Sequence, residues 1–203
     1  MKKYYKHLFL LIIVLASSGC ALGPEKRDPP AGFDLGPPPA FTAAAPSINA
    51  TLLIPTVSAS PWLDTPNILY RLAYRDAGRP EAYAQHRWVM SPALLLSERL
   101  RGRFAAATRG VVNTQDGARA DYSLRIELED FSQSFDAAQS SHANVRLRAT
   151  LIDLNTRALH AQKSFSVARP AAPNAPGAAR SLAAAGDAVV EELVTWAAQS
   201  LKK

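Results

Sequence analysis

Few side chains in this sequence could perform acid–base or metal chemistry. Beyond the first ten residues the histidines are His86, His142 and His160, and none is paired with another histidine, a cysteine or a carboxylate at metal-ligand spacing. A short acidic cluster consists of Glu127, Glu129 and Asp130. It alternates with apolar residues and follows Arg125, which is typical of solvated charges on a strand face.

Motifs for nucleophilic or phosphate chemistry are also missing from the sequence. It contains no G-x-S-x-G elbow, no phosphate-binding glycine loop and no G-x-G-x-x-G pattern. We therefore predict no catalytic residues, no metal and no cofactor, and we favour a binding or scaffolding protein over an enzyme.

The N-terminus has the pattern of a bacterial export signal. Three lysines within residues 1–6 precede an apolar run at residues 8–16, and small residues follow at positions 17–19. The apolar run is about half as long as the roughly 20 residues that cross a bilayer. Residues 1–19 are therefore predicted to be a signal peptide rather than a membrane span.

Cys20 is the only cysteine of the chain and directly follows these small residues. The segment Ala16-Ser17-Ser18-Gly19-Cys20 resembles the lipobox of bacterial lipoproteins, although Ser17 stands where leucine is usual. We predict that Cys20 becomes the acylated, palmitate-bearing N-terminus. The alternative is a plain secretory signal that leaves Cys20 as a free thiol.

The residue after the cysteine indicates the destination of the lipoprotein. Position 21 is Ala21, not the aspartate that is associated with inner-membrane retention in enteric bacteria. By that analogy we expect the inner leaflet of the outer membrane, facing the periplasm, with the inner membrane as the alternative. Removal of the signal peptide takes away three lysines, so the mature chain has 20 basic and 17 acidic side chains, a net charge of +3. This small charge gives little reason to propose nucleic acid as a partner.

Residues 20–47 have the composition of a tether. Seven of the fifteen prolines lie between residues 21 and 47, with neither a strand period nor a helix period. At about 3.1 Å per residue an extended segment of this kind reaches on the order of 80 Å. We therefore place the folded domain at residues 48–203.

The first half of that domain is expected to hold strands and one helix. The expected strands are residues 52–57, interrupted by Pro55, residues 68–74, and residues 83–90. A turn at residues 76–80 makes the last two an antiparallel pair. Ser91-Pro92 is typical of a helix start, and Ala93, Leu96, Leu100 and Phe104 share one face of that helix.

The second half is expected to form an antiparallel meander followed by a helix. Alternating residues predict strands at 122–131, with a bulge near Asp130, at 144–151 and at 159–167. Residues 168–180 are predicted to be a loop and residues 182–201 an amphipathic helix. The whole order predicts an α+β fold: a largely antiparallel sheet with two amphipathic helices packed on one face.

The segment from residue 62 to residue 104 resembles the ABC-type transport auxiliary lipoproteins, the paraquat-inducible protein C-like family. The resemblance is carried by Trp62-Leu63-Asp64-Thr65-Pro66, Leu69-Tyr70-Arg71, Tyr83-Ala84-Gln85-His86-Arg87-Trp88, Pro92 and Leu95-Leu96. It extends more loosely over residues 50–200. In this family the lipoproteins work beside proteins with mammalian-cell-entry (MCE) domains, which carry lipids between membranes.

The resemblance implies a non-enzymatic docking subunit of an ABC-type, MCE-containing lipid transport system that maintains envelope integrity. MCE proteins form rings, so a homo-oligomeric ring of the lipoprotein is a further expectation. Trp62, Asp64 and Pro66 lie in a predicted loop and are candidates for contact with a partner or a neighbouring subunit. Arg71 and Arg87 are placed on the polar face of one hairpin, where they could meet an acidic partner surface.

Two other functions stay open from the sequence. A direct periplasmic lipid carrier would need an acyl-chain cavity and more apolar residues than the ordinary stripes seen here. Such a carrier should copurify with phospholipid after removal of the anchor, whereas a scaffold should not. An envelope enzyme with an unrecognised site is the third alternative.

Overall fold

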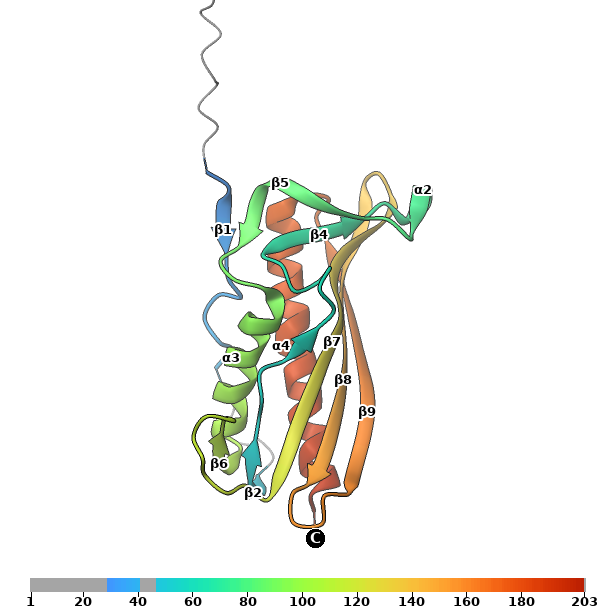
Figure 1. The fold of residues 1–203 in the computed structure, drawn as a ribbon. Coiled ribbons are helices and arrows are strands. Elements are labelled where there is room, and N and C mark those ends of the chain that lie inside the picture. Colours follow the sequence, from blue (N-terminus) through green and yellow to red (C-terminus); the bar gives the residue numbers. More distant parts are fainter. Residues whose placement is uncertain (1–28, 41–46, 203) are drawn as a thin grey trace, which may run out of the picture.

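The computed structural model describes residues 29–40 and 47–202 of the chain, and within these residues nine strands and three helices form one α+β unit (Figure 1). The strands are β1 (Ala31–Phe33), β2 (Ile48–Leu53), β3 (Ser58–Ala59), β4 (Asn67–Arg71), β5 (Pro80–Trp88), β6 (Thr108–Val112), β7 (Tyr122–Ala137), β8 (Ser140–Asp153) and β9 (Leu159–Ala171). The helices are α2 (Ala73–Asp76), α3 (Pro92–Ala105) and α4 (Ala175–Ser200). The predicted signal peptide, Cys20 and most of the predicted tether lie outside the described residues.

The sheet is organised around the long strand β7. Along one side β7 pairs antiparallel with β8, which pairs antiparallel with β9. Along its other side β7 pairs in parallel with β2, β3 and β4 in succession. β5 joins β4 antiparallel, while β1 and β6 add in parallel to β5 and β2. The α+β fold is confirmed, and the sheet is mixed, with its longest ladders antiparallel.

The meander β7–β8–β9 follows the alternation of its sequence. Leu124, Ile126 and Leu128 of β7 are buried, and the pairing with β8 shifts register between Leu128 and Asp130, which confirms the predicted bulge. Because the bulge adds one residue to β7, the next side chain that points into the core is that of Phe131.

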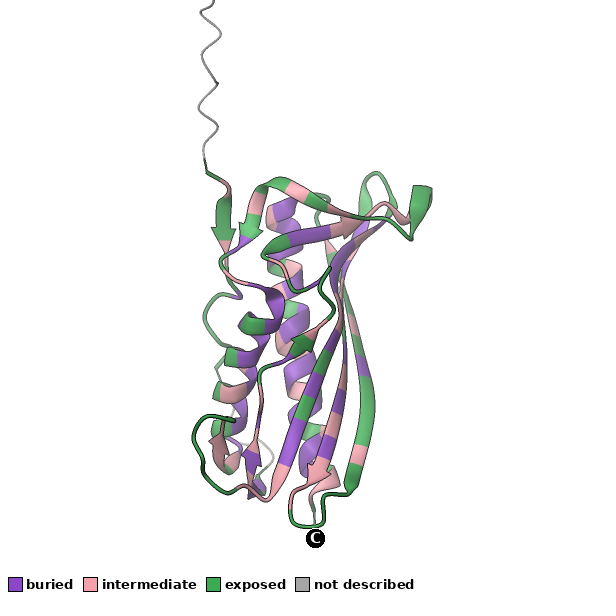
Figure 2. Cartoon of the chain, in the orientation of Figure 1, coloured by how far each residue is buried: buried purple, intermediate pink, exposed green. Residues whose placement is uncertain are grey.

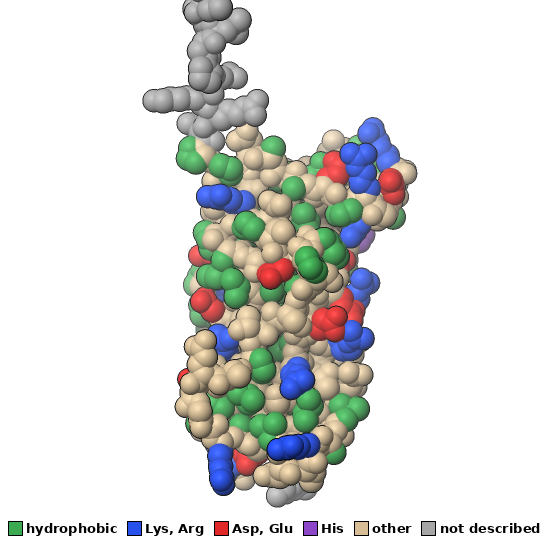
Figure 3. All heavy atoms as spheres, in the orientation of Figure 1, with side chains coloured by type: hydrophobic (Ala, Val, Ile, Leu, Met, Phe, Trp, Pro, Cys, Tyr) green, Lys and Arg blue, Asp and Glu red, His purple; other side chains and the backbone are tan. Residues whose placement is uncertain are grey.

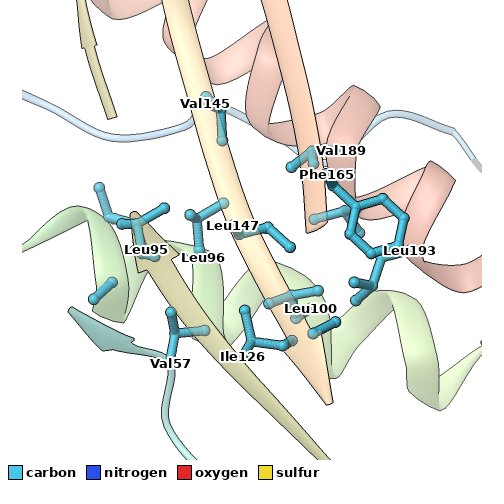
Figure 4. Close-up of a cluster of buried hydrophobic side chains, with 14 of the residues drawn as sticks. Val57, Leu95, Leu96, Leu100, Ile126, Val145, Leu147, Phe165, Val189 and Leu193 are labelled. Carbon is cyan, nitrogen blue, oxygen red and sulfur yellow. The ribbon is translucent and has the colours of Figure 1, made fainter. Parts of the chain in front are cut away.

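Both long helices lie on the same side of the sheet, α4 against β8 and β9 and α3 against α4 and β6 (Figure 1). Figure 4 shows Leu95, Leu96 and Leu100 of α3 gathered with side chains of the strands and of α4. The buried faces of both helices are visible as purple segments in Figure 2. The helix start at Pro92 is confirmed, although the Ser91 side chain makes no capping hydrogen bond.

Trp88 and Leu96 are fully buried. Trp88 lies edge-on to Phe131, with 5.6 Å between the ring centres. Edge-on aromatic contacts add about 0.5–1.5 kcal/mol beyond the area that is buried. In the Arg87-Trp88 pair, which carries part of the family resemblance, the tryptophan therefore lies in the core and the arginine lies on the surface.

The prediction of a loop at residues 168–180 is wrong. β9 continues to Ala171 and α4 begins at Ala175. Pro170 is tolerated because, among the described residues, β9 pairs only with β8 and has no partner along its other edge. Asn174 caps α4 by accepting a hydrogen bond from the Gly177 N–H at 2.8 Å, and the following proline lies in the first turn, where no N–H is needed.

The prediction that the whole of residues 20–47 is an extended tether also needs correction. Residues 31–33 form β1, which pairs with β5, and Leu35 is buried with 7% of its surface exposed. The apolar side chains of Phe33 and Leu35 pack against the core of the domain and hold this part of the proline-rich segment on it. We call residues 31–36 the strap.

Two local details were not predicted. Strand β6 lies at residues 108–112, where the sequence has little alternation. The strand expected at residues 68–74 ends at Arg71, and α2 follows it. The Leu72 carbonyl accepts hydrogen bonds from the backbone N–H groups of Arg75 and Asp76 in α2. The Asp76 side chain accepts a hydrogen bond from the Gly78 N–H at 2.9 Å.

Candidate functional site

Trp62 lies on the surface because the residue after it lies in the core. Leu63 is 1% exposed, and its N–H and that of Asp64 both bond to the Ser60 carbonyl at 2.9 Å. This tight turn between β3 and β4 directs Trp62 outward, with 41% of its surface exposed. A large aromatic residue held in this way is available for contact with another molecule.

Arg71 lies beside this tryptophan. Its guanidinium carbon is 5.2 Å from the centre of the Trp62 ring, and it donates a hydrogen bond to the Ala77 carbonyl at 3.2 Å. A cation over an indole contributes about 0.5–1 kcal/mol at an exposed site. The structure thus brings together two of the residues that the sequence suggested for partner contact.

A second exposed aromatic–arginine pair follows on α2. Tyr74 is 43% exposed, and the Arg75 guanidinium carbon lies 5.5 Å from its ring centre. Arg79 continues the basic series and is 3.7 Å from Glu81. In Figure 3 blue and red side chains crowd this projecting corner. We call Trp62, Arg71, Tyr74, Arg75 and Arg79 the Trp62–α2 surface.

The other candidates lie outside this surface or at its border. Asp64 is exposed in the same turn as Trp62. Pro66 is exposed, and its carbonyl accepts a hydrogen bond from the Trp88 N–H at 2.7 Å. Arg87 pairs with Asn67 at the opposite end of the β4–β5 hairpin from Arg71. The predicted hairpin is confirmed, but its two arginines do not lie side by side.

The acidic cluster separates into two environments. Glu127 pairs with Arg148 at 2.6 Å and Glu129 with Arg146 at 3.4 Å, on the outer face of the sheet. Asp130, at the bulge, is half-buried, and burial raises the pKa of its carboxyl. The Ser132 hydroxyl, 2.7 Å away, and the charges of Arg146 and Arg71 oppose that rise in pKa.

The histidines have separate and unrelated neighbours. His86 stacks on Phe33 of the strap, His142 bonds to Asp136 at 2.9 Å, and His160 bonds to the Ser200 carbonyl at 2.9 Å. In residues 29–40 and 47–202 there is no group of three or more His, Cys, Asp or Glu residues that could hold a metal ion. No helix in the same part of the chain is long and apolar enough to cross a membrane.

Tyr74, Arg75 and Arg79 were missed by sequence reasoning. The pattern around them suggested a strand and a turn, whereas α2 forms there and the Ala77 carbonyl after it accepts a hydrogen bond from Arg71 of the first aromatic–arginine pair. The sequence carried one usable signal, a run of arginines and aromatics from residue 70 to residue 79.

Comparison with known proteins identifies the family. The family model for the ABC-type transport auxiliary lipoprotein component matches residues 33–195, and this chain belongs to that family. The predicted family is therefore confirmed. The match begins within β1, so part of the strap belongs to the family's domain. The family is described as a lipoprotein component auxiliary to ABC-type transport.

Relatives and solved structures support the same fold. An uncharacterized protein of Bradyrhizobium diazoefficiens is 26% identical over 171 residues, covering 81% of this chain and 44% of that protein. The chain thus spans less than half the length of this curated relative. Protein XCC0632 of Xanthomonas campestris has a TM-score of 0.70 at 23% identity, covering 85% of this chain and 94% of that one. The hypothetical protein CT253 of Chlamydia trachomatis has a TM-score of 0.50 at 9% identity, covering 75% and 98%.

Proposed function

We propose that this chain is an outer-membrane lipoprotein, acylated at Cys20, that serves as a non-enzymatic docking subunit of an ABC-type lipid transport system. Its partner in this proposal is a periplasmic MCE-domain protein of that system, and its role is to maintain envelope integrity. The observation that carries the proposal is the exposed Trp62, stacked with Arg71, in a chain of the transport auxiliary family.

The Trp62–α2 surface has the composition of a protein interface. Tryptophan, tyrosine and arginine dominate interface hot spots, and their removal commonly costs 2 kcal/mol or more of binding free energy. Here both aromatic rings are exposed and each has an arginine beside it. The basic series Arg71, Arg75 and Arg79 favours an acidic face on the partner.

A ring of copies is part of the proposal because the family's MCE partners are ring-forming. In such a ring each copy would repeat the Trp62–α2 surface around the axis, and several weak contacts would act together. Asp64, Pro66 and Arg87 are then candidates for contact between neighbouring copies. The mass of the detergent-extracted complex after crosslinking tests this part.

The test of docking is mild crosslinking in intact cells, purification through a tag after Lys203 and mass spectrometry of the recovered proteins. We expect an MCE-domain protein as the dominant partner. Trp62→Ala should reduce its recovery severalfold, since the change removes the exposed ring and leaves Leu63 and the turn in place. Leu159→Ala, at another exposed apolar residue, is the matched control and should leave recovery unchanged.

Two results would argue against docking. Recovery that is the same for Trp62→Ala and for Leu159→Ala would exclude this surface as the contact. Recovery of phospholipid without any MCE-domain protein, from cells in which Cys20 is acylated, would replace docking with the direct lipid carrier.

A further inference from the structure

A second apolar surface lies at the start of α3. Val89 and Leu94, on either side of the first residue of α3, are 59% and 44% exposed. Val89 borders a hollow of about 370 Å³ whose apolar lining also includes Leu35, Met90 and Leu95, the residue after Leu94. Single exposed apolar residues are ordinary, but a cluster around a hollow marks an interaction site. We call Val89, Met90 and Leu94 the α3-start patch.

The strap brings the N-terminal segment to this patch. The Val89 N–H bonds to the Phe33 carbonyl at 2.8 Å. Arg99 of α3 donates to the Leu35 and Gly36 carbonyls at 2.9 and 2.7 Å, and its other amino group lies 3.3 Å from Asp187 of α4. The side chain of Arg99 is only 10% exposed, so one arginine fastens the strap to both long helices.

The length of chain ahead of the strap limits how far the patch can move from an anchor at Cys20. Ala31 is eleven residues after Cys20, which corresponds to about 34 Å at the polyproline rise of about 3.1 Å per residue. That is less than half the reach expected of a tether running to residue 47. A docked strap therefore keeps the patch close to the membrane that holds the anchor.

The charges around the patch are mixed. Asp34 and Glu98 line the same hollow as Arg99 and Arg103, and Arg180 lines a neighbouring one. Arg99 already faces Asp187, and Arg103 is paired with Glu191. The patch therefore lacks the basic excess that would select anionic lipid, and its contact with a bilayer would come from apolar side chains.

We propose that the α3-start patch is a membrane-contact surface, with Val89 and Leu94 held against the phospholipid bilayer that carries the Cys20 anchor. This rests on the acylation of Cys20 in the proposed function. The arrangement leaves the docking surface accessible, because α2 lies on the opposite side of the molecule from β1 and α3 (Figure 1).

The test couples the chain from Cys20 onward, through its only thiol, to a maleimide lipid in phosphatidylcholine vesicles with brominated acyl chains. Bromine quenches tryptophan fluorescence at short range. Leu94→Trp places a reporter in the patch. Leu159→Trp is the matched control, because Leu159 is 64% exposed and begins β9 at the end of the molecule far from β1 (Figure 1). The added emission of each variant over the parent chain is measured with and without bromine.

We expect at least twofold stronger quenching of the reporter at position 94 than of the reporter at position 159. Equal quenching of both, or none at position 94, would overturn the proposal. Replacing a third of the lipid by phosphatidylglycerol should leave the ratio unchanged, and quenching that appeared only with anionic lipid would contradict apolar contact. Because the anchor is supplied chemically and no partner is present, failure here is distinct from failure of docking or of acylation in cells.

Discussion

Among single residues, Gln133 shows how a buried polar group joins distant parts of this chain. Its side chain is fully buried, accepts a hydrogen bond from the Tyr83 hydroxyl at 2.6 Å and donates to the Ser141 hydroxyl and the Ala172 carbonyl at 2.7 and 2.9 Å. The amide thus links β5, β7, β8 and the residues before α4. A buried amide with partners on both its oxygen and its nitrogen avoids the cost of an unmet hydrogen bond.

Removing one partner of this amide should cost stability. We predict that Tyr83→Phe lowers the free energy of unfolding by about 1–3 kcal/mol, because the amide oxygen of Gln133 loses its donor in a buried site. Tyr74→Phe, on the exposed α2, should change it by less than about 0.5 kcal/mol. Urea unfolding followed by circular dichroism measures both, and equal effects would contradict the role given to the network.

The same tyrosine should make stability depend on pH in the alkaline range. Burial, with a smaller contribution from the neighbouring Tyr70, raises the pKa of Tyr83 from 10.0 to about 12. The folded chain therefore holds this proton more tightly than the unfolded chain does. Its contribution to stability is complete below pH 10 and is lost as the pH rises from about 10 to about 12. Unfolding at pH 9 and pH 11.5 should show a smaller loss for Tyr83→Phe than for the parent chain.

At the scale of elements, two glycines of the long helices have opposite surroundings. A Cβ on Gly177, in the first turn of α4, would lie 2.5 Å from the Ala172 carbonyl oxygen. A Cβ on Gly102, within α3, would meet nothing within 4 Å. The close approach at Gly177 lets the chain turn from β9 into α4 within three residues.

These surroundings predict that a glycine-to-alanine substitution changes the stability of the domain in opposite directions at the two positions. Gly177→Ala should destabilise the domain by about 1–3 kcal/mol, since backbone atoms must shift. Gly102→Ala should stabilise it by about 0.5–1 kcal/mol, because alanine costs less backbone entropy in a helix. Thermal unfolding of the pair provides the comparison, and effects of the same sign would show that the packing at the start of α4 is misjudged.

The strap makes its own prediction through Arg99. Replacing Arg99 by alanine removes both hydrogen bonds to the strap and the cation that faces Asp187. Burial raises the pKa of the Asp187 carboxyl, and the charge of Arg99 partly opposes that rise. We expect the Val89 amide, bonded to Phe33, to exchange with deuterium at least tenfold faster. Glu98→Ala, one residue away and exposed, should leave that rate unchanged. Exchange that is equally slow in both variants would show that Arg99 does not hold the strap.

Sequence patterns predicted the elements whose partners are close along the chain. The β7–β8–β9 meander and the start of α3 follow from alternation and from Ser91-Pro92. Strap docking, strand β6 and the parallel pairing of β2, β3 and β4 with β7 depend on contacts between residues far apart in sequence, which a local period cannot carry. At the candidate site the sequence suggested Trp62 and Arg71 separately, but their stacking required the turn that buries Leu63 and the end of β4 at Arg71.

For the whole molecule, the two proposed surfaces separate anchoring from docking. The strap and the start of α3 lie on one side of the domain, and α2 projects on the other (Figure 1). A protein held at the membrane on one side and exposed to the periplasm on the other can join a membrane to a soluble assembly. The effective concentration set by a short tether would strengthen contacts that are individually weak.

Anchoring is tested by one substitution. Cys20→Ser removes the thiol that would carry the acyl chains, and two such chains already suffice for stable attachment. We predict that the variant moves from the membrane fraction to the soluble periplasmic fraction, or stays as an uncleaved precursor, and that mass spectrometry of the parent protein finds an acylated N-terminal cysteine. A parent protein that begins at another residue, or that lacks acyl mass, would contradict the predicted lipoprotein signal.

The most direct test of the docking claim is the dissociation constant between the purified chain and the MCE-domain protein recovered by crosslinking. We predict that Trp62→Ala weakens binding at least tenfold, about 1.4 kcal/mol, while Leu159→Ala changes it less than twofold. A Trp62→Ala variant that binds within twofold of the parent chain would contradict the central role of this surface.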